Sequence, residues 1–275
     1  MSQITLTLTQ RPRQPIDARG LTPTALGALG LEAVKALPLK VGNRSVELGS
    51  LFEVETRPAA APRLIFRGET QGIEGIGRDL EAGHIEVEGS AGSYVGQSMR
   101  GGSLRVQGSI EAYGACELRG GVLEVLGDAG DFLGAALPGN AKGMSGGVVL
   151  VRGSAGDRVG DHLRRGLIVI EGGAGDYLGA RMKAGSILVQ GAVGAFPGYA
   201  MNRGSLLLAT PPKALLPTFR DCGSHTLGFI PLLLNSLTPH QTVFRSLAPR
   251  FSRIRRYAGD FSALGKGELI HPLEA

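Results

Sequence analysis

The chain has little cysteine and few aromatic residues, and these shortages limit its chemistry. Only two of its 275 residues are cysteines, Cys116 and Cys222, tryptophan is absent, and aromatic residues make up 5%. Neither cysteine belongs to a CxxC motif or to a cluster with zinc or iron–sulfur spacing. We therefore expect no disulfide framework, and no metal site or redox centre built from cysteines of this chain.

Long apolar runs are also missing. No stretch of 18 or more apolar residues occurs, and the N-terminal sequence MSQITLTLTQR lacks the hydrophobic region of a signal peptide. This pattern predicts a cytoplasmic protein that does not span a membrane.

Part of the net charge of +5 is concentrated near the C-terminus, where five arginines follow one another with no acid between them. They are Arg245, Arg250, Arg253, Arg255 and Arg256. Basic residues beside aromatic ones are one pattern of nucleic-acid binding. Because no recognition motif accompanies them, we favour docking on an acidic partner or on the chain's own acids, and expect no nucleic-acid partner.

Glycine, by contrast, is abundant, with 44 residues, and much of it recurs every 19 residues between residues 83 and 204. One interval is 26 residues long because a seven-residue insertion lies within it. The marks of successive repeats are Gly83, Gly102, Gly121, Gly147, Gly166, Gly185 and Gly204. A fixed period near 20 residues indicates a stack of similar structural units.

Two columns of the aligned repeat are wholly aliphatic and lie two residues apart, as on one face of a β-strand. The third place holds Ile85, Leu104, Leu123, Val149, Ile168, Ile187 and Leu206, and the fifth holds Val87, Val106, Val125, Val151, Ile170, Val189 and Leu208. Nineteen residues are too few for a strand with a crossover helix, which needs about 30. The chain is therefore predicted to be mainly β, with a right-handed parallel β-helix (solenoid) of about seven coils, each of two or three short strands.

Glycines at fixed places after the marks are interpreted as corners of the coils, since glycine accepts both positive φ and close backbone approach. These predicted corners are Gly89, Gly96, Gly108, Gly127, Gly134, Gly153, Gly160, Gly172, Gly179, Gly191 and Gly198. The stretch GGAGDYLGA at residues 172–180 superficially resembles a phosphate-binding loop. Similar glycines recur in every coil, which favours the corner interpretation.

The sequence divides into three predicted parts: a capping segment at residues 1–60, the β-helix at residues 61–210, and an extension at residues 211–275 that packs on the helix or on a partner. The cap is expected to be α/β. Alternation at residues 4–8 predicts a strand, Pro23 begins a helix that extends to about Leu37, and residues 42–43 predict a turn.

The fourth place of the repeat changes character along the stack. It is polar in the early coils and aliphatic in the late ones, in the order Glu86, Arg105, Glu124, Leu150, Val169, Leu188 and Leu207. An outward aliphatic row needs a cover. We predict that the apolar segment around residues 230–237 covers it, or that a partner subunit does.

A basic edge is predicted along one corner of the stack. It consists of Arg100, Arg119, Arg164 and Lys183. Such a row is a candidate binding site for an acidic surface or a polyanionic ligand or cofactor, and the alternative is a solvated corner.

Two further columns carry residue types that can bind ligands. Asp131, Asp157 and Asp176 could hold calcium, but without a nonapeptide repeat we favour a solvated or arginine-paired edge. The column Tyr94, Tyr113, Phe132, Arg158, Tyr177 and Phe196 could bind sugars, or pack beneath a flanking segment or partner.

The dipeptide Asp161-His162 resembles a fragment of a catalytic site. No serine or cysteine nucleophile occupies an equivalent place on an adjacent coil, and the other histidines are scattered. We assign no catalytic residue and no metal site to this chain.

The repeat, written G-x-[LIV]-x-[VI]-x-G-x-A-G-x-x-x-G, resembles the GXGXG domain of the glutamate synthase large subunit. It resembles more closely the C subunit of formylmethanofuran dehydrogenase, whose flanking regions are similar to PIDARGLTP at residues 15–23, GNRSVELGSLFEV at residues 42–54 and RRYAGDFSALGKGEL at residues 255–269. The resemblance extends over nearly the whole chain.

This resemblance implies a non-catalytic scaffold subunit of a formyltransferase/hydrolase complex in methylotrophic one-carbon metabolism. Such a complex moves a formyl group between tetrahydromethanopterin and a methanofuran-type carrier and releases formate. Its other subunits would be of amidohydrolase, formyltransferase and dehydrogenase-like types and would hold any metals, while this chain binds no cofactor of its own. The basic edge would then contact the acidic tail of the carrier.

Two alternatives stay open. The parent complex could be a redox-active molybdenum or tungsten formylmethanofuran dehydrogenase. The chain could also be a free-standing carbohydrate-active β-helix protein, for which Asp157 and Asp176 would be the candidate acids beside the aromatic column.

Overall fold

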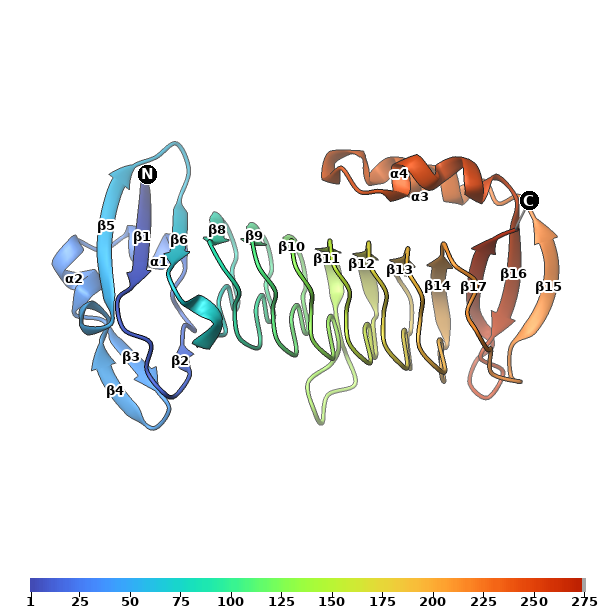
Figure 1. Ribbon diagram of the computed structural model, residues 1–275, viewed down its shortest axis with the longest axis horizontal. Coiled ribbons are helices and arrows are strands. Elements are labelled where there is room, and N and C mark those ends of the chain that lie inside the picture. Colours follow the sequence, from blue (N-terminus) through green and yellow to red (C-terminus); the bar gives the residue numbers. More distant parts are fainter. Residues whose placement is uncertain (274–275) are drawn as a thin grey trace.

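The computed structural model describes residues 1–273 and shows an elongated, mainly β molecule (Figure 1). Each repeat contributes one strand, and neighbouring strands pair in parallel. These strands are β8 (His84–Val87), β9 (Ser103–Val106), β10 (Val122–Val125), β11 (Ser145–Val151), β12 (Arg165–Ile170), β13 (Ser186–Val189) and β14 (Arg203–Leu208). The return segments pair only through single bridges, such as Ala91 with Ile110. The expectation of two or three strands in each coil is therefore wrong.

The strands pair in the register that the repeat dictates, so that like residues stack on like. Leu123 lies opposite Leu104 on one neighbouring strand and Val149 on the other. In the fourth place, Glu124 lies opposite Arg105 and Leu150. A slip of one residue would turn the aliphatic columns toward solvent, which is why the hydrophobic pattern fixes this register.

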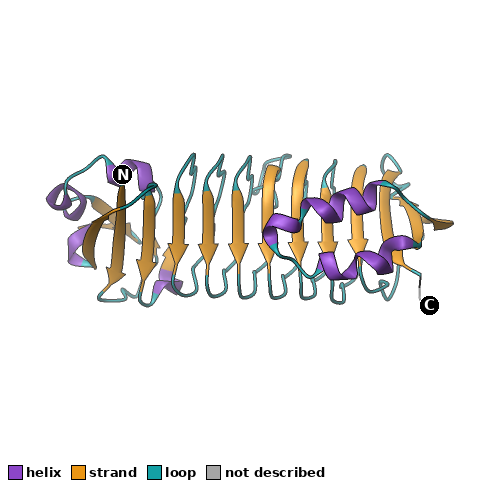
Figure 2. Ribbon diagram, turned by 90° about the horizontal axis from the view of Figure 1, so that it is seen from above, coloured by secondary structure: helices purple, strands orange, loops and turns teal. Residues whose placement is uncertain are grey.

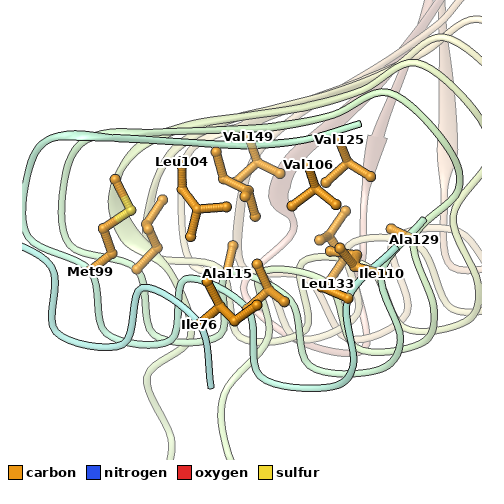
Figure 3. Packing of buried hydrophobic residues seen from close by; sticks show 14 of the residues in the cluster. Ile76, Met99, Leu104, Val106, Ile110, Ala115, Val125, Ala129, Leu133 and Val149 are labelled. Atoms are coloured by element: carbon orange, nitrogen blue, oxygen red, sulfur yellow. The ribbon is translucent and has the colours of Figure 1, made fainter. Parts of the chain in front are cut away.

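The aliphatic columns meet in one continuous interior (Figure 3). Leu104 and Val106 point inward from β9, while Met99 and Leu133 approach the same space from the return segments. All four side chains are fully or almost fully buried. Because each coil is thin, Val, Ile, Leu, Met and Ala fill it, and the scarcity of large aromatic residues follows from that geometry.

Most of the predicted corner glycines are needed for one of two reasons. Gly160 has φ of +68°, a conformation that glycine adopts without a steric penalty. Gly108 has an ordinary φ, but a Cβ there would lie 2.7 Å from the backbone nitrogen of Ser90 on the preceding coil. The left-handed group comprises Gly96, Gly134, Gly160, Gly179 and Gly198, and the close-approach group comprises Gly108, Gly127, Gly153, Gly172 and Gly191. Gly89 belongs to neither group, because a Cβ there would lie 3.5 Å from Gly68 O, the nearest backbone atom of the preceding coil.

The N-terminal segment extends the long sheet and adds a small second one. The long sheet gains β6 (Arg63–Arg67), β1 (Ser2–Leu8) and β5 (Phe52–Pro58), of which only β5 is antiparallel to its neighbour. The second sheet contains β4 (Arg44–Glu47), β3 (Pro38–Val41), β2 (Ile16–Asp17) and β7 (Ile73–Glu74). The strand and turn predicted here at residues 4–8 and 42–43 are confirmed.

The single helix predicted from Pro23 to about Leu37 is wrong. The segment forms two one-turn helices, α1 (Pro23–Gly27) and α2 (Leu31–Lys35), beside the 3-10 turns η1 (Leu48–Ser50) and η2 (Thr70–Gly72). The first begins as predicted, with Thr22 Oγ1 accepting a hydrogen bond from Ala25 N at 3.2 Å. Gly27 and Gly30 lie at the break, where the helix propensity of glycine is low.

The C-terminal segment continues the sheet and then covers it. Strand β17 (Lys266–Pro272) pairs in parallel with β14, and β16 (Ile254–Gly259) and β15 (Arg220–His225) follow in antiparallel order. The covering part contains α3 (Phe229–Ser236), η3 (Thr238–His240), α4 (Phe244–Leu247) and η4 (Ala248–Ser252). The continuation of the parallel run by β17 was not predicted.

The predicted cover of the late coils is confirmed. The fourth-place residues from Leu150 to Leu207 form a second buried cluster with Ile230 and Leu234 of α3 and with Phe244 of α4. Seen from above, the helices lie across the strands toward the C-terminal end, while β8 and β9 stay uncovered (Figure 2). The transition from polar to aliphatic residues therefore marks where the chain folds back on its own sheet.

Candidate functional site

The four cations of the basic edge occupy equivalent places at one corner of the stack. Each donates its backbone N–H to the carbonyl of the coil before it, for example Arg119 N to Met99 O at 2.8 Å and Lys183 N to Leu163 O at 2.7 Å. Arg100 pairs with Glu81 at 3.3 Å, and Lys183 Nζ donates to the Ala141 carbonyl at 3.1 Å.

Arg119 and Arg164, the middle pair of this edge, have exposed side chains and take part in none of the ion pairs found among residues 1–273. Ser145 occupies the equivalent place on the coil between them, with its backbone N–H donated to Leu118 O at 2.7 Å. At about 4.8 Å per coil, Arg119 and Arg164 therefore lie roughly 10 Å apart. The structure thus brings the basic edge together as two pairs of cations in one row, with a serine between the pairs, and the two inner cations have no acidic partner among residues 1–273.

The aromatic column forms two short stacks on a different corner. Tyr94 stacks on Tyr113 with ring centroids 5.3 Å apart, and Tyr113 stacks on Phe132 at 4.8 Å. Further along, the guanidinium of Arg158 lies 4.6 Å from the centre of the Tyr177 ring, which contacts Phe196 at 5.2 Å. Arg158 therefore joins the column as a cation on an aromatic face rather than interrupting it.

All six members of this column have a left-handed backbone, with φ between 58° and 63°. Such a conformation costs a non-glycine residue about 1–3 kcal/mol, so packing and hydrogen bonds must hold it. The members are Tyr94, Tyr113, Phe132, Arg158, Tyr177 and Phe196. Residue type gave no signal of this geometry, because aromatic residues and arginine rarely adopt it.

The carboxylates of Asp131, Asp157 and Asp176 satisfy backbone donors. Each accepts a hydrogen bond from a backbone N–H of the following coil, to Asp157 N at 2.8 Å, Asp176 N at 2.8 Å and Ala195 N at 2.7 Å. Asp131 and Asp157 are exposed, as predicted for a solvated edge, and none of the three aspartates forms an ion pair with an arginine among residues 1–273. The hydrogen bond to the next coil was not predicted, and it resembles the capping bond at a helix end, repeated along the stack.

Asp161 and His162 belong to a closed, charge-balanced group. The Asp161 side chain is 5% exposed, and Arg181 holds both of its carboxylate oxygens. His162 Nδ1 lies 3.0 Å from the same carboxylate, and burial lowers the pKa of His162 below its usual value despite that partner. Both carboxylate oxygens are thus occupied by contacts within the chain.

Arg152 makes a structural contact that was not predicted from the sequence. It lies between Glu124 and Glu171, each at 2.7 Å, and donates to the His240 carbonyl at 2.8 Å. Glu171 also accepts a hydrogen bond from Val243 N at 3.0 Å. This group fixes the edge of the C-terminal cover at the point where the sheet changes from polar to aliphatic.

A cleft with a volume of about 770 Å³ was not predicted from the sequence. It lies between the second sheet, the first coils and the seven-residue insertion. Its lining comprises Pro15, Asp17, Arg19, Lys40, Gly42, Glu74, Gly75, Arg78, Tyr94, Gln97, Leu137 and Pro138. A cleft of this size with a few polar groups is typical of small-molecule sites.

Residues 1–273 contain no group of three or more His, Cys, Asp or Glu side chains placed to hold a metal ion. Within that same part of the chain, no helix is long and apolar enough to cross a membrane. Cys116 is buried and Cys222 is partly exposed, and both are free thiols.

No protein-family model matches the chain. It is 34% identical over 98 residues to the C subunit of the tungsten-containing formylmethanofuran dehydrogenase 2 of Methanothermobacter wolfeii, a match that covers 34% of this chain and 36% of the relative. It is 34% identical over 91 residues to the C subunit of the molybdenum-containing formylmethanofuran dehydrogenase 1 of Methanosarcina barkeri, covering 30% of each chain. The chain thus spans about a third of the length of these curated relatives.

The structural match is far more extensive. A chain of the formyltransferase/hydrolase complex (FhcABCD) from Methylorubrum extorquens, crystallised in complex with methylofuran, superposes with a TM-score of 0.92. The two chains are 37% identical, and the match covers 98% of this chain and all of the other. Together, these matches show that the chain belongs to the family of formylmethanofuran dehydrogenase C subunits.

Proposed function

We propose that the chain is the non-catalytic scaffold subunit of a formyltransferase/hydrolase complex. In this proposal the complex moves a formyl group between tetrahydromethanopterin and a methanofuran-type carrier and releases formate. The observation that carries the proposal is the end-to-end match, at 37% identity, with a chain of such a complex.

The architecture supports a scaffold role. We infer that the stack is a right-handed parallel β-helix with an N-terminal cap at residues 1–60, coils at residues 61–210 and a C-terminal extension from residue 211. Residue-for-residue stacking on one face, with single parallel bridges on the return side, supports this interpretation. So does the general right-handedness of parallel crossovers. Each coil is fixed to its neighbours by backbone hydrogen bonds, which makes a stiff platform for other subunits.

The expected sister subunits are of amidohydrolase, formyltransferase and dehydrogenase-like types, with any metals in those subunits. The strongest acid–base candidates on this chain, Asp161 and His162, are occupied by a structural ion pair, which agrees with chemistry located elsewhere in the complex. The test is to purify this chain with an affinity tag from cells that make it naturally. Stoichiometric recovery of amidohydrolase-type and formyltransferase-type proteins is expected, whereas a chain recovered alone would contradict the proposal.

A second candidate is a subunit of a redox-active formylmethanofuran dehydrogenase. The tungsten- and molybdenum-containing relatives favour it, although each match covers only about a third of this chain. Elemental analysis of the purified complex separates the two. Stoichiometric molybdenum or tungsten with iron–sulfur clusters would favour the redox complex, and their absence from an active preparation would favour the hydrolytic one.

The basic edge is proposed to contact the acidic part of the carrier. Reversal of Arg100, Arg119, Arg164 and Lys183 to glutamate should lower the affinity of the assembled complex for methylofuran at least tenfold. The matched control reverses four exposed cations elsewhere, Arg13, Arg44, Lys213 and Arg220, with the same change in net charge. Unchanged affinity of the edge variant in an intact complex would contradict this role and leave the scaffold proposal standing.

A further inference from the structure

The cleft of about 770 Å³ beside the second sheet has no part in the scaffold proposal. Its floor belongs to the first two coils, where Gly75, Tyr94 and Gln97 lie. One side comes from β2 and β3, and the other from Leu137 and Pro138 of the seven-residue insertion. The second sheet and the seven-residue insertion thus form opposite sides of the cleft, and the first coils form its floor.

The aromatic column ends in this cleft at Tyr94. Tyr113 covers one face of Tyr94. The equivalent residue one coil earlier is Gly75, which has a matching backbone, with φ of 68° against 63° for Tyr94, but no side chain. A Cβ on Gly75 would lie 2.9 Å from Cγ of Arg19, so the stem of that arginine lies beside the place where the next member of the column would begin. Among residues 1–273, no aromatic ring stacks on the face of Tyr94 that points away from Tyr113.

Two polar side chains beside this ring lack partners. Gln97 is 6% exposed and lines the cleft, yet its side-chain amide makes none of the hydrogen bonds found among residues 1–273. Glu74 forms none of the ion pairs of that part of the chain, and burial, together with the carboxylates of Glu111 and Asp17, raises its pKa. Thr218 and Thr242 carry the fully buried side-chain oxygens without a partner among residues 1–273, so the Gln97 amide is reachable from the cleft. The amide and the carboxylate can therefore accept hydrogen bonds from a molecule bound there.

Cations lie at the mouth of the cleft. Lys40 is exposed and belongs to none of the ion pairs of residues 1–273, and Arg78 has only a 3.5 Å contact with its neighbour Asp79. Arg19, in contrast, is held by Asp17 through hydrogen bonds at 2.7 Å. The two weakly engaged cations can therefore accept a negatively charged group.

We infer that the cleft binds a small planar heteroaromatic molecule with an anionic tail. Its ring packs against Tyr94, its edge donates adjacent N–H groups to Glu74 and Gln97, and its tail reaches Lys40 and Arg78. A carboxylate that accepts two neighbouring N–H groups distinguishes a guanine-type edge from an adenine-type edge. Such a site goes beyond the scaffold role and does not depend on it.

The test is calorimetric titration of the full chain with guanosine 5′-monophosphate. Saturable binding at one site is expected, with adenosine 5′-monophosphate at least tenfold weaker. Tyr94→Leu should weaken binding about tenfold, since it removes the aromatic ring against which the base packs. Tyr177→Leu, at an equivalent place further along the stack, should leave the affinity unchanged.

Two surface variants keep the test independent of any effect on folding. Lys40→Gln combined with Arg78→Gln should reduce the affinity to that of guanosine, which has no phosphate. Glu74→Gln should abolish the preference for the guanine nucleotide. Absence of saturable binding, equal affinity for both nucleotides, or no effect of Tyr94→Leu would overturn the inference. Burial of the cleft by a sister subunit in the intact complex, with no nucleotide binding to the free chain, would assign it to a protein partner instead. None of these results affects the co-purification test of the scaffold role.

Discussion

Arg152 Nη2 donates a hydrogen bond to the carbonyl oxygen of His240 at 2.8 Å, which joins the sheet to the segment that covers it. The same guanidinium pairs with Glu124 and Glu171. One guanidinium therefore forms ion pairs with two carboxylates on the sheet and also holds the end of the C-terminal cover. Because its side chain is 22% exposed, solvent screens these contacts only in part.

Replacement of Arg152 by methionine should loosen this end of the cover. The change leaves Glu124 and Glu171 without their shared cation and the His240 carbonyl without its donor, and we expect a loss of about 1–3 kcal/mol. Hydrogen exchange of the amides at residues 238–243 should become faster, together with a lower denaturant midpoint. Arg105→Met is the matched control, since Arg105 is 54% exposed and lies 3.7 Å from the Glu124 carboxylate. Equal effects of both variants would contradict the role of Arg152.

The cover depends on the apolar face of α3. Leu234 is 1% exposed, whereas Leu232 on the same helix is 72% exposed. Leu234→Ala should lower the free energy of unfolding by about 2–5 kcal/mol, as buried leucine truncations do, and Leu232→Ala should change it by less than about 0.5 kcal/mol. Chemical denaturation of the two variants measures the difference, and similar values would contradict the packing of α3 on the late coils.

The aspartate ladder should depend on hydrogen-bond acceptance rather than on charge. Asp157→Ala leaves the backbone N–H of Asp176 without its acceptor at 2.8 Å and should cost about 1 kcal/mol. Asp157→Asn keeps an acceptor oxygen and should be close to neutral. Thermal unfolding of both variants, with and without calcium, is the measurement. A calcium-dependent increase in stability that both substitutions abolish would support a metal site instead.

The two thiols should differ in reactivity. Burial raises the pKa of Cys116 to about 12. At pH 8 only about one Cys116 thiol in ten thousand would be ionised, so a thiol reagent should modify the partly exposed Cys222 alone until the chain unfolds. Two rapidly reacting thiols in the native protein would contradict the buried position of Cys116.

The same shift has a consequence for stability. Because the pKa of Cys116 is higher in the folded than in the unfolded chain, the folded state favours the neutral thiol. The contribution of Cys116 to the free energy of unfolding is therefore complete below pH about 9 and is lost as the pH rises toward 12. The difference in unfolding free energy between the native chain and Cys116→Ala should therefore shrink over that interval. A difference that stays constant from pH 8 to pH 11 would show that the thiol titrates normally.

Much of the fold could be predicted because one pattern repeats. A column such as Leu104, Leu123 and Val149 is aliphatic because it faces the interior in every coil. Each repeat therefore predicts the same strand register independently. The change from Glu124 to Leu150 in the fourth place also predicted the cover, since an outward aliphatic row requires one.

The backbone conformation of the aromatic column, the aspartate hydrogen bonds, the Arg152 contacts and the cleft could not be predicted from a repeated pattern. Tyr113 and Arg158 adopt a left-handed backbone that their residue types disfavour, and only the stacking of coils makes it acceptable. Asp157 is exposed as predicted, but its role as an acceptor depends on the backbone of the next coil and was not predicted. Arg152 and the cleft at Tyr94 join segments far apart in the chain, which a local pattern does not bring together.

The central claim is that this chain holds a formyl-transferring complex together without performing its chemistry. The most direct measurement is native mass spectrometry of the complex, isolated through a sister subunit from cells with and without this chain, combined with an assay of formate release. We predict that cells lacking the chain yield separated sister subunits and no formate release from the carrier, and that addition of the purified chain restores both. An intact, active complex without the chain would contradict the claim.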